Sequence, residues 1–492
     1  MMNLTQHESH SESAALVARI VRNSLFVFLA RALETLIRIV LVAITARYLG
    51  VELFGEFAFI MAIAALLIPI LDFGVERIIV REISIDIANA DKYVSSALIL
   101  RMVFSIVLIL AIITVTHMLH WDQRMALALF VATCSQIFLA FGIVFLGVFR
   151  SFERMEYDIL LSFFHQLIKL TSIVVVVAYD LGLLSIFLAM ALADLSKTVL
   201  QAITVSLKFF RPRLILNLNY CKLLLKEAYP IAIFAFLAMM SFKVDVFILK
   251  YFRGPVEISL FEIPHRIIMQ IQILSMSIVI ALFPLLSRLA KSSRSSLEYA
   301  YEKVFKVLLN LSLPITILII IWAKEIIIAV FGKEYLDASL ALQILVGTLS
   351  SLFLTSLMNF TLISIGKQTL TIVSIVICFC VNLLLDLLLV PKYGYLGASV
   401  GTLAAYLCFF CTALYFTSKN VCNIPIISIA YKTIVCGIIM ILGCITFKSG
   451  TLLSFVVGVT TGILCYVFTM IALKTFTTEE LNLFKRAITN RA

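Results

Sequence analysis

The amino-acid sequence predicts an all-α polytopic membrane protein with about 14 transmembrane helices. Of its 492 residues, 62% are hydrophobic, and the mean hydropathy is +1.11. Only 14% are charged, whereas about a quarter of the residues in a soluble domain carry a charge. The apolar residues form continuous runs that can each cross about 30 Å of hydrocarbon. Strands of a membrane β-barrel would instead alternate over segments of about ten residues, so that class is excluded.

Each predicted helix is one continuous apolar run, bounded by polar residues, glycine or proline. The segments between the runs are too short for a soluble domain with an active site, so an enzyme is not expected. The first six runs cover residues 24–46, 57–75, 94–116, 125–149, 159–179 and 181–206. The others cover residues 228–250, 261–286, 305–328, 338–364, 368–390, 397–418, 427–447 and 451–473.

Two short patterns recur about 200 residues apart and indicate an internal repeat. Residues 48–50 follow the first run as residues 251–254 follow the seventh, an offset of 203. Residues 179–182 follow the fifth run as residues 392–394 follow the eleventh, with an offset of 214 between Tyr179 and Tyr393. Each unit holds an even number of helices, so both cross the membrane in the same sense, as parallel repeats do. We therefore expect two six-helix lobes in parallel pseudo-repeat around a central cavity, plus two C-terminal helices.

The distribution of Lys and Arg predicts the orientation. Of these residues, 24 fall on the side of the N-terminus and 8 on the opposite side, and cytoplasmic segments carry the excess. The net charge of +11 is thus a topology signal, and no nucleic-acid partner is expected. The expected order is a cytoplasmic tail (1–22), an N-lobe (23–208), a cytoplasmic inter-lobe loop (209–226), a C-lobe (227–420), two further helices (421–474) and a cytoplasmic tail (475–492).

The first predicted helix carries three charges on one face. Arg31, Glu34 and Arg38 are spaced i, i+3 and i+7, which aligns them along one stripe of a helix. A charged residue facing lipid near a helix centre costs about 2.5 to 3.5 kcal/mol. We expect this stripe to line a watered cavity, and the alternative is a buried structural ion triad.

Charged residues also lie in later runs. Lys169 falls in the fifth, Lys243 and Asp245 in the seventh, and Glu262 and Arg266 near the start of the eighth. Glu262 and Arg266 are four residues apart and can pair, whereas Lys243 and Asp245 point to nearly opposite sides and need separate partners. The three basic residues also lie near enough to helix ends to reach an interface instead.

A surplus of Arg and Lys inside the membrane favours an anionic substrate, because these groups bind phosphate and carboxylate. We assign substrate binding to Arg31, Arg38, Lys169, Lys243 and Arg266. Glu34, Asp245 and Glu262 would bind a coupling H⁺ or Na⁺ or hold the basic residues in place. No catalytic residue, bound metal or other cofactor is expected.

Several motifs resemble polysaccharide flippases of the Wzx type, the O-antigen, capsule and exopolysaccharide flippases of the multidrug/oligosaccharidyl-lipid/polysaccharide exporter superfamily. Residues 46–50, 54–55 and 72–74 (Ala-Arg-Tyr-Leu-Gly, Phe-Gly and Asp-Phe-Gly) are similar to the family's opening. Residues 244–252 look like its seventh helix, and residues 382–398 are the most specific match. Many members have twelve helices, which leaves the subfamily open.

The resemblance implies a function. The substrate would be a polyprenyl (undecaprenyl) pyrophosphate-linked oligosaccharide, flipped by alternating access across the inner, plasma membrane of a bacterium for surface polysaccharide biosynthesis. Membrane lipids and polysaccharide polymerase machinery would be further partners. Three alternatives remain: a multidrug or cation exporter of the same fold, a lipid II flippase, and a membrane glycan polymerase or ligase. We assign structural roles to Gly50, Gly55, Gly394 and Gly397, which permit tight turns, and to Pro391, which is expected to end its helix.

Overall fold

The computed structural model describes residues 2–213, 216–423, 425–448, 452–473 and 475, and gives side chains from Leu33 onward except at 427, 452 and 453. Its elements are helices throughout the described residues. They are α1 (Met2–Asp72), α2 (Val75–Ile85), η1 (Ile87–Asn89), α3 (Ala90–Met118), α4 (Gln123–Ser151), α5 (Met155–Ala178), α6 (Gly182–Lys208), α7 (Leu218–Phe252), α8 (Pro255–Ser292), α9 (Arg294–Phe331), η2 (Lys333–Tyr335), α10 (Ala338–Leu345), α11 (Thr348–Ser364), α12 (Gln368–Asn420), α13 (Ile426–Ile445) and α14 (Leu452–Ala472).

Twelve of the described segments are long and apolar enough to cross a membrane. Two of them, Leu33–Ile85 and Gln368–Asn420, are 53 residues long. At 1.5 Å per residue, such a length exceeds twice the thickness of the hydrocarbon core. Each of the two therefore holds a pair of crossings, and the described residues contain the 14 crossings that the sequence predicts.

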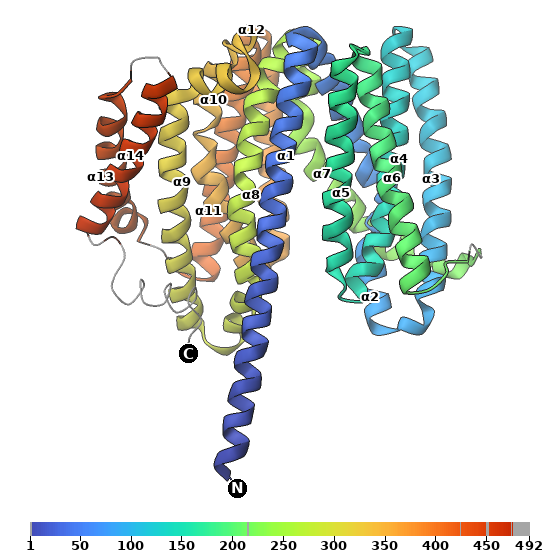
Figure 1. The fold of residues 1–492 in the computed structure, drawn as a ribbon, viewed down its shortest axis with the longest axis horizontal. Coiled ribbons are helices and arrows are strands. Elements are labelled where there is room, and N and C mark those ends of the chain that lie inside the picture. The colour runs from blue at the N-terminus through green and yellow to red at the C-terminus, as the bar shows by residue number, and fades with distance from the viewer. Residues whose placement is uncertain (1, 214–215, 424, 449–451, 474, 476–492) are drawn as a thin grey trace.

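Glycine breaks both long helices. Gly50 in α1 has φ 68° and ψ 177°, and Gly394 in α12 has φ 56° and ψ −135°. The two ends of α12 lie side by side, because Lys367 donates a hydrogen bond to Asn420. In Figure 1, α1 begins at the lower end, and α2, which follows it, lies at that end again. The chain thus reverses at each glycine, where a positive φ suits a residue without a Cβ.

Other predicted turn residues have different surroundings. Gly55 lies within α1, where a Cβ would stand 1.8 Å from the carbonyl oxygen of Pro255. Gly397 lies within α12, where a Cβ would stand 2.6 Å from the carbonyl oxygen of Leu389. These two glycines therefore allow close backbone packing. Pro391 is inside α12, and the helix breaks three residues later, at Gly394.

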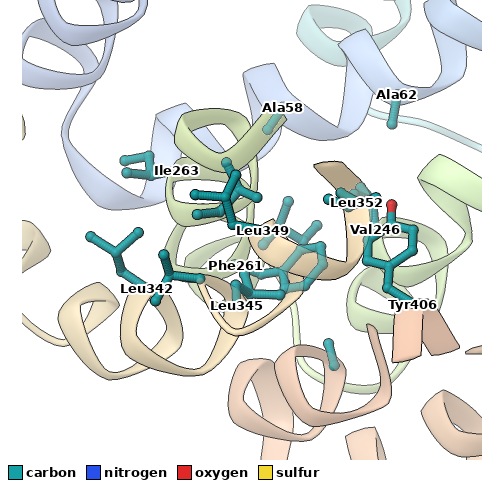
Figure 2. Close-up of a cluster of buried hydrophobic side chains, with 14 of the residues drawn as sticks. Ala58, Ala62, Val246, Phe261, Ile263, Leu342, Leu345, Leu349, Leu352 and Tyr406 are labelled. Atoms are coloured by element: carbon teal, nitrogen blue, oxygen red, sulfur yellow. The ribbon is translucent and has the colours of Figure 1, made fainter. Parts of the chain in front are cut away.

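The helices gather in two groups. Helices α3–α6 lie on one side of the molecule and α8–α12 on the other, with α1 and α7 between them, while α13 and α14 pack beyond α9 (Figure 1). The central core joins α1 to the second group. Figure 2 shows Ala58 of α1 near Phe261 and Ile263 of α8, and Ala62 of α1 on the side of Val246 and Leu352, among residues of α7, α10, α11 and α12.

Helix α1 is joined firmly to the second group at the Gly50 end of the molecule, by which we mean the end where α1 reverses. Tyr335 donates a hydrogen bond to the carbonyl oxygen of Ala46 at 2.8 Å, and Arg47 Nε donates to that of Val330 at 2.9 Å. Ser259 also donates to the carbonyl oxygen of Val51. These contacts close this end of the space between α1 and α8.

Candidate functional site

A cavity of about 340 Å³ lies between the two groups of helices. Helices α1, α5, α6, α7 and α8 all contribute to its wall, so both groups take part. Among the described residues that line it, the charged side chains are all cations, and two glutamines add polar groups. The lining residues are Arg38, Leu41, Val42, Thr45, Phe57, Met61, Ala65, Gln166, Lys169, Ile173, Met190, Lys243, Arg266 and Gln270.

The reversal at Gly50 forms one corner of this cavity. Arg38, Val42 and Thr45 come from the first crossing of α1, and Ala65 and Phe57 come from the second. The two crossings therefore face the same space. Arg38 pairs with Glu34 one helical turn before it, with 3.4 Å between Nη2 and Oε2. Because the side chain of Glu34 is 2% exposed and that of Arg38 is 41% exposed, the cation faces the cavity and the carboxylate does not.

A second group of charges centres on Glu262, which is fully buried. Lys243 Nζ of α7 lies 2.6 Å from Glu262 Oε1, and Arg266 Nε lies 2.9 Å from Oε2. The guanidinium of Arg266 also stands over the rings of Phe54 and Phe57, at 5.7 and 5.9 Å from their centroids. One carboxylate thus holds a lysine and an arginine beside each other, and aromatic rings fix the arginine further.

A third group lies across the cavity, on α5 and α6. Asp194 Oδ1 is 2.7 Å from His165 Nε2 and 3.9 Å from Lys169 Nζ. Ser135 of α4 donates a hydrogen bond to the other oxygen, Oδ2. Lys169 and His165 stand one turn apart on α5 and share this single carboxylate.

All three groups follow one rule. Each cation of the cavity wall is paired with a carboxylate whose side chain is 2% exposed or less, namely Glu34, Asp194 or Glu262. The cations keep 17 to 41% of their side chains exposed. An entering ligand therefore meets positive charge, and the buried carboxylates hold the cations in position.

Asp245 occupies a different place, between α7 and α12. Its Oδ1 accepts hydrogen bonds from Asn382 Nδ2 at 3.1 Å and from Thr402 Oγ1 at 2.9 Å. Asp386 interacts with the same carboxylate, and neither of its own oxygens accepts a hydrogen bond in the described structure. Asp245 is 2% exposed and Asp386 is fully buried. Two neighbouring buried carboxyl groups with an amide and a hydroxyl form an oxygen-rich cluster suited to a small cation or a proton.

The structure brings together four of the five predicted basic residues, Arg38, Lys169, Lys243 and Arg266. Glu34 and Glu262 lie behind them, and Asp245 lies in the separate oxygen-rich cluster. Arg31 is in α1, but its side chain is outside the described residues.

The predicted site residues leave out four members of the cavity groups, namely Gln166, Gln270, His165 and Asp194. Gln270 lies one turn after Arg266 and Gln166 three residues before Lys169, so helical spacing from a known cation would have found both. Asp194 is on a different helix from the two cations it contacts, and no local spacing reveals that contact.

The fold matches solved membrane transporters. The structure of a lipid II flippase, MurJ, in an inward closed conformation superposes with a TM-score of 0.77 at 15% identity, covering 92% of this chain and 99% of that one. An inward-facing multidrug resistance transporter of the MATE family and MOP superfamily superposes with a TM-score of 0.64 at 16% identity, covering 79% and 94%. The protein therefore has the fold of multi-pass exporters of the MOP superfamily.

Sequence comparison identifies the family. The family described as "Polysaccharide biosynthesis protein" matches residues 20–290, more than half of the chain, and the protein belongs to it. The matched region contains all four cations of the cavity wall.

Two relatives are archaeal. Over 400 residues the chain is 23% identical to the "Probable low-salt glycan biosynthesis flippase Agl15" of Haloferax volcanii, covering 79% of this chain and 81% of that protein. A shorter match, 32% identical over 146 residues, links 29% of this chain to 28% of an uncharacterised membrane protein of Methanocaldococcus jannaschii. The named relatives are flippases and transporters, which are not enzymes.

Proposed function

We propose that this protein is a flippase for a polyprenyl pyrophosphate-linked oligosaccharide, which it moves across the plasma membrane by alternating access. The observation that carries the proposal is the cavity wall, where four cations from both helix groups converge and each is held by a buried carboxylate. Membership of a polysaccharide biosynthesis family and the likeness to a glycan biosynthesis flippase support the choice of substrate.

The chemistry of the wall favours phosphate. Two guanidinium groups, those of Arg38 and Arg266, line the cavity and also a small adjoining pocket between α1 and α8. A guanidinium donates two parallel hydrogen bonds to phosphate oxygens, and the ammonium of a lysine adds a compact positive charge to the site. A cationic drug would meet four like charges here, which argues against the multidrug exporter alternative.

Transport would require the Gly50 end to open. The contacts of Arg47, Tyr335 and Ser259 close that end in the present conformation. With both termini in the cytoplasm, as the distribution of Lys and Arg indicates, the substrate head group would enter from the cytoplasmic side and leave past these contacts.

Coupling to an ion would use the oxygen-rich cluster of Asp245, Asn382, Asp386 and Thr402. Two buried carboxyl groups side by side are unfavourable unless a cation or a proton lies between them. We therefore assign Asp245 to binding the coupling Na⁺ or H⁺, and Glu34 and Glu262 to holding the basic residues.

The test is transport of a short-chain fluorescent polyprenyl pyrophosphate glycan in proteoliposomes. Lys243→Gln and Arg266→Gln should each lower the initial rate tenfold or more, because removing one charged partner from a buried hydrogen-bonded pair typically costs about 2 kcal/mol or more. Lys291→Gln removes the same charge from an exposed position and should keep the wild-type rate.

Wild-type rates in both cavity variants would contradict the proposal. Efflux of cationic dyes without glycan-lipid transport would support the drug exporter instead, and transport restricted to lipid II would support the lipid II flippase. Formation of sugar bonds by the purified protein would support the polymerase or ligase.

A further inference from the structure

We infer that His165 and Asp194 form a proton-binding site whose occupancy is coupled to the binding of an anion at Lys169. The inference rests on the proposed function, because the anion is the phosphate group of the lipid-linked glycan. It adds a second ionic site, in the first group of helices and away from the oxygen-rich cluster around Asp245.

The site is built around one buried carboxylate with several partners. The Asp194 side chain is 1% exposed, so its charge is compensated by neighbours and not by bulk water. His165 Nε2 lies 2.7 Å from Oδ1, and Lys169 Nζ lies 3.9 Å from the same atom. The hydroxyl of Ser135 donates a hydrogen bond to the other oxygen of Asp194, Oδ2. The imidazole and the ammonium therefore compete for one oxygen.

The two competitors differ in their access to the cavity. The Lys169 side chain is 17% exposed and lines the cavity, whereas that of His165 is 9% exposed and lies one turn away on α5. Lys169 also makes the longer contact with Asp194. An anion in the cavity can thus draw Lys169 toward itself while His165 remains beside the carboxylate.

Other charged and polar groups also lie around the imidazole of His165, and each has its own position or partner. Lys197 of α6 faces it at longer range and donates a hydrogen bond to Ser162 Oγ at 3.0 Å. Ser162 in turn donates to Asp158 Oδ1 at 3.3 Å. From α4 the neighbour is Ser135, and α1 contributes Arg38 to the wall of the same cavity.

The sign of the coupling follows from this arrangement. When an anion draws Lys169 away, Asp194 loses part of its compensation, and a proton on the other ring nitrogen of His165, Nδ1, restores it. Anion binding therefore favours proton uptake from water, and by reciprocity a lower pH favours anion binding. The protonated imidazole also adds a positive charge beside the cavity.

The experiment measures binding of geranylgeranyl pyrophosphate to the purified full-length protein by calorimetry at pH 6 and pH 8. Two buffers with different ionisation enthalpies report the protons taken up. The wild-type protein should bind about fivefold or more tightly at pH 6 and take up a fraction of a proton. His165→Gln, which keeps a hydrogen-bond donor for Asp194, should lose both effects. The terminal phosphate of the probe itself titrates near pH 6, but this acts in the opposite direction and equally in both proteins.

Three further variants make the result specific. Lys169→Gln should bind more weakly and without a pH effect, and it tests the coupling even if the His165 variant does not fold. His117→Gln, at an exposed position near the end of α3, should keep the wild-type pH effect.

His265 stacks on Phe261 beside Glu262, so loss of the pH effect in His265→Gln and not in His165→Gln would overturn the inference. Tight binding at both pH values would also overturn it while leaving the proposed function intact, whereas no binding at either pH would contradict the proposed function.

Discussion

At the scale of single residues, the buried carboxylates organise the site. Glu262 is contacted by Lys243 and Arg266 at 2.6 and 2.9 Å and has no exposed surface. Without its negative charge, two cations would stand beside each other in a partly dehydrated space. The role of Glu262 is therefore positional and energetic, and a ligand need never touch it.

We expect Glu262→Gln to destabilise the protein by about 3 kcal/mol, because removing one member of a buried ion group leaves the others uncompensated. The midpoint of thermal unfolding should fall accordingly. Glu298→Gln is the matched control, because Glu298 pairs with Arg294 at the surface, where their side chains are 38% and 73% exposed. Glu298→Gln should lower the stability by less than about 1 kcal/mol. Equal shifts of the unfolding midpoint in the two variants would contradict the positional role of Glu262.

A glycine makes room for the oxygen-rich cluster. A Cβ at Gly401 would stand 2.5 Å from Asp386 Oδ1, so Gly401→Ala should displace this carboxylate and weaken coupling. Transport driven by a cation gradient should fall, while binding of the substrate analogue should persist. In Gly147→Ala the new Cβ would have its nearest contact at 3.4 Å, so this variant should behave as wild type.

At the scale of elements, Arg101 holds the corner between α1 and α2. Its side chain is fully buried and donates hydrogen bonds to the carbonyl oxygen of Leu71 and to Asp72, with a weaker one to the carbonyl oxygen of Ala140 at 3.3 Å. Phe73 and Gly74 both have positive φ, 49° and 74°. Arg101 thus satisfies carbonyl groups that the helix end leaves open.

Arg101→Leu should lower stability by about 3 to 5 kcal/mol, because Asp72 would lose its buried partner and Leu71 its donor. Thermal unfolding in detergent would measure the change. Arg154→Leu removes an arginine whose pair with Glu156 is more than half exposed on both sides, and it should shift the midpoint little.

The sequence predicts helices better than it predicts their neighbours. Continuous apolar runs located the crossings, and the spacing of Glu262 and Arg266 correctly predicted their pairing. The opposite orientations of Lys243 and Asp245 were also predicted, and each has its own partners. The contact of Asp194 with His165 and Lys169 joins two helices, and no periodicity within either helix specifies how they pack.

At the scale of the whole molecule, the proposed transport cycle makes the Gly50 end a gate between α1 and the second helix group. Arg47 donates hydrogen bonds to the carbonyl oxygens of Val330 and Ala329, at the end of α9. In the proposed cycle, these bonds lie across the interface that would separate when this end opens. Each stabilises the closed form and contributes nothing to the open one.

Arg47→Ala should therefore shift the population toward the form that is open at the Gly50 end. Thr45 lines the cavity just inside the gate, so a Thr45→Cys reporter measures this shift. In a background without the exposed Cys380 and Cys411, a membrane-impermeant maleimide added outside cells should label the reporter faster when Arg47→Ala is present. Unchanged labelling would contradict a gating role for Arg47.

The pairing of cations with buried carboxylates also has an electrical consequence. The four cations and three carboxylates of the described cavity groups leave one positive charge on the empty site. A bound pyrophosphate diester with two negative charges would change that to one negative charge, less the fraction of a proton taken up at His165. A membrane potential of 100 mV acts on each such charge with about 2.3 kcal/mol. A potential that is negative inside would therefore favour outward movement of the loaded site and inward return of the empty site. The membrane potential would thus drive both halves of the transport cycle.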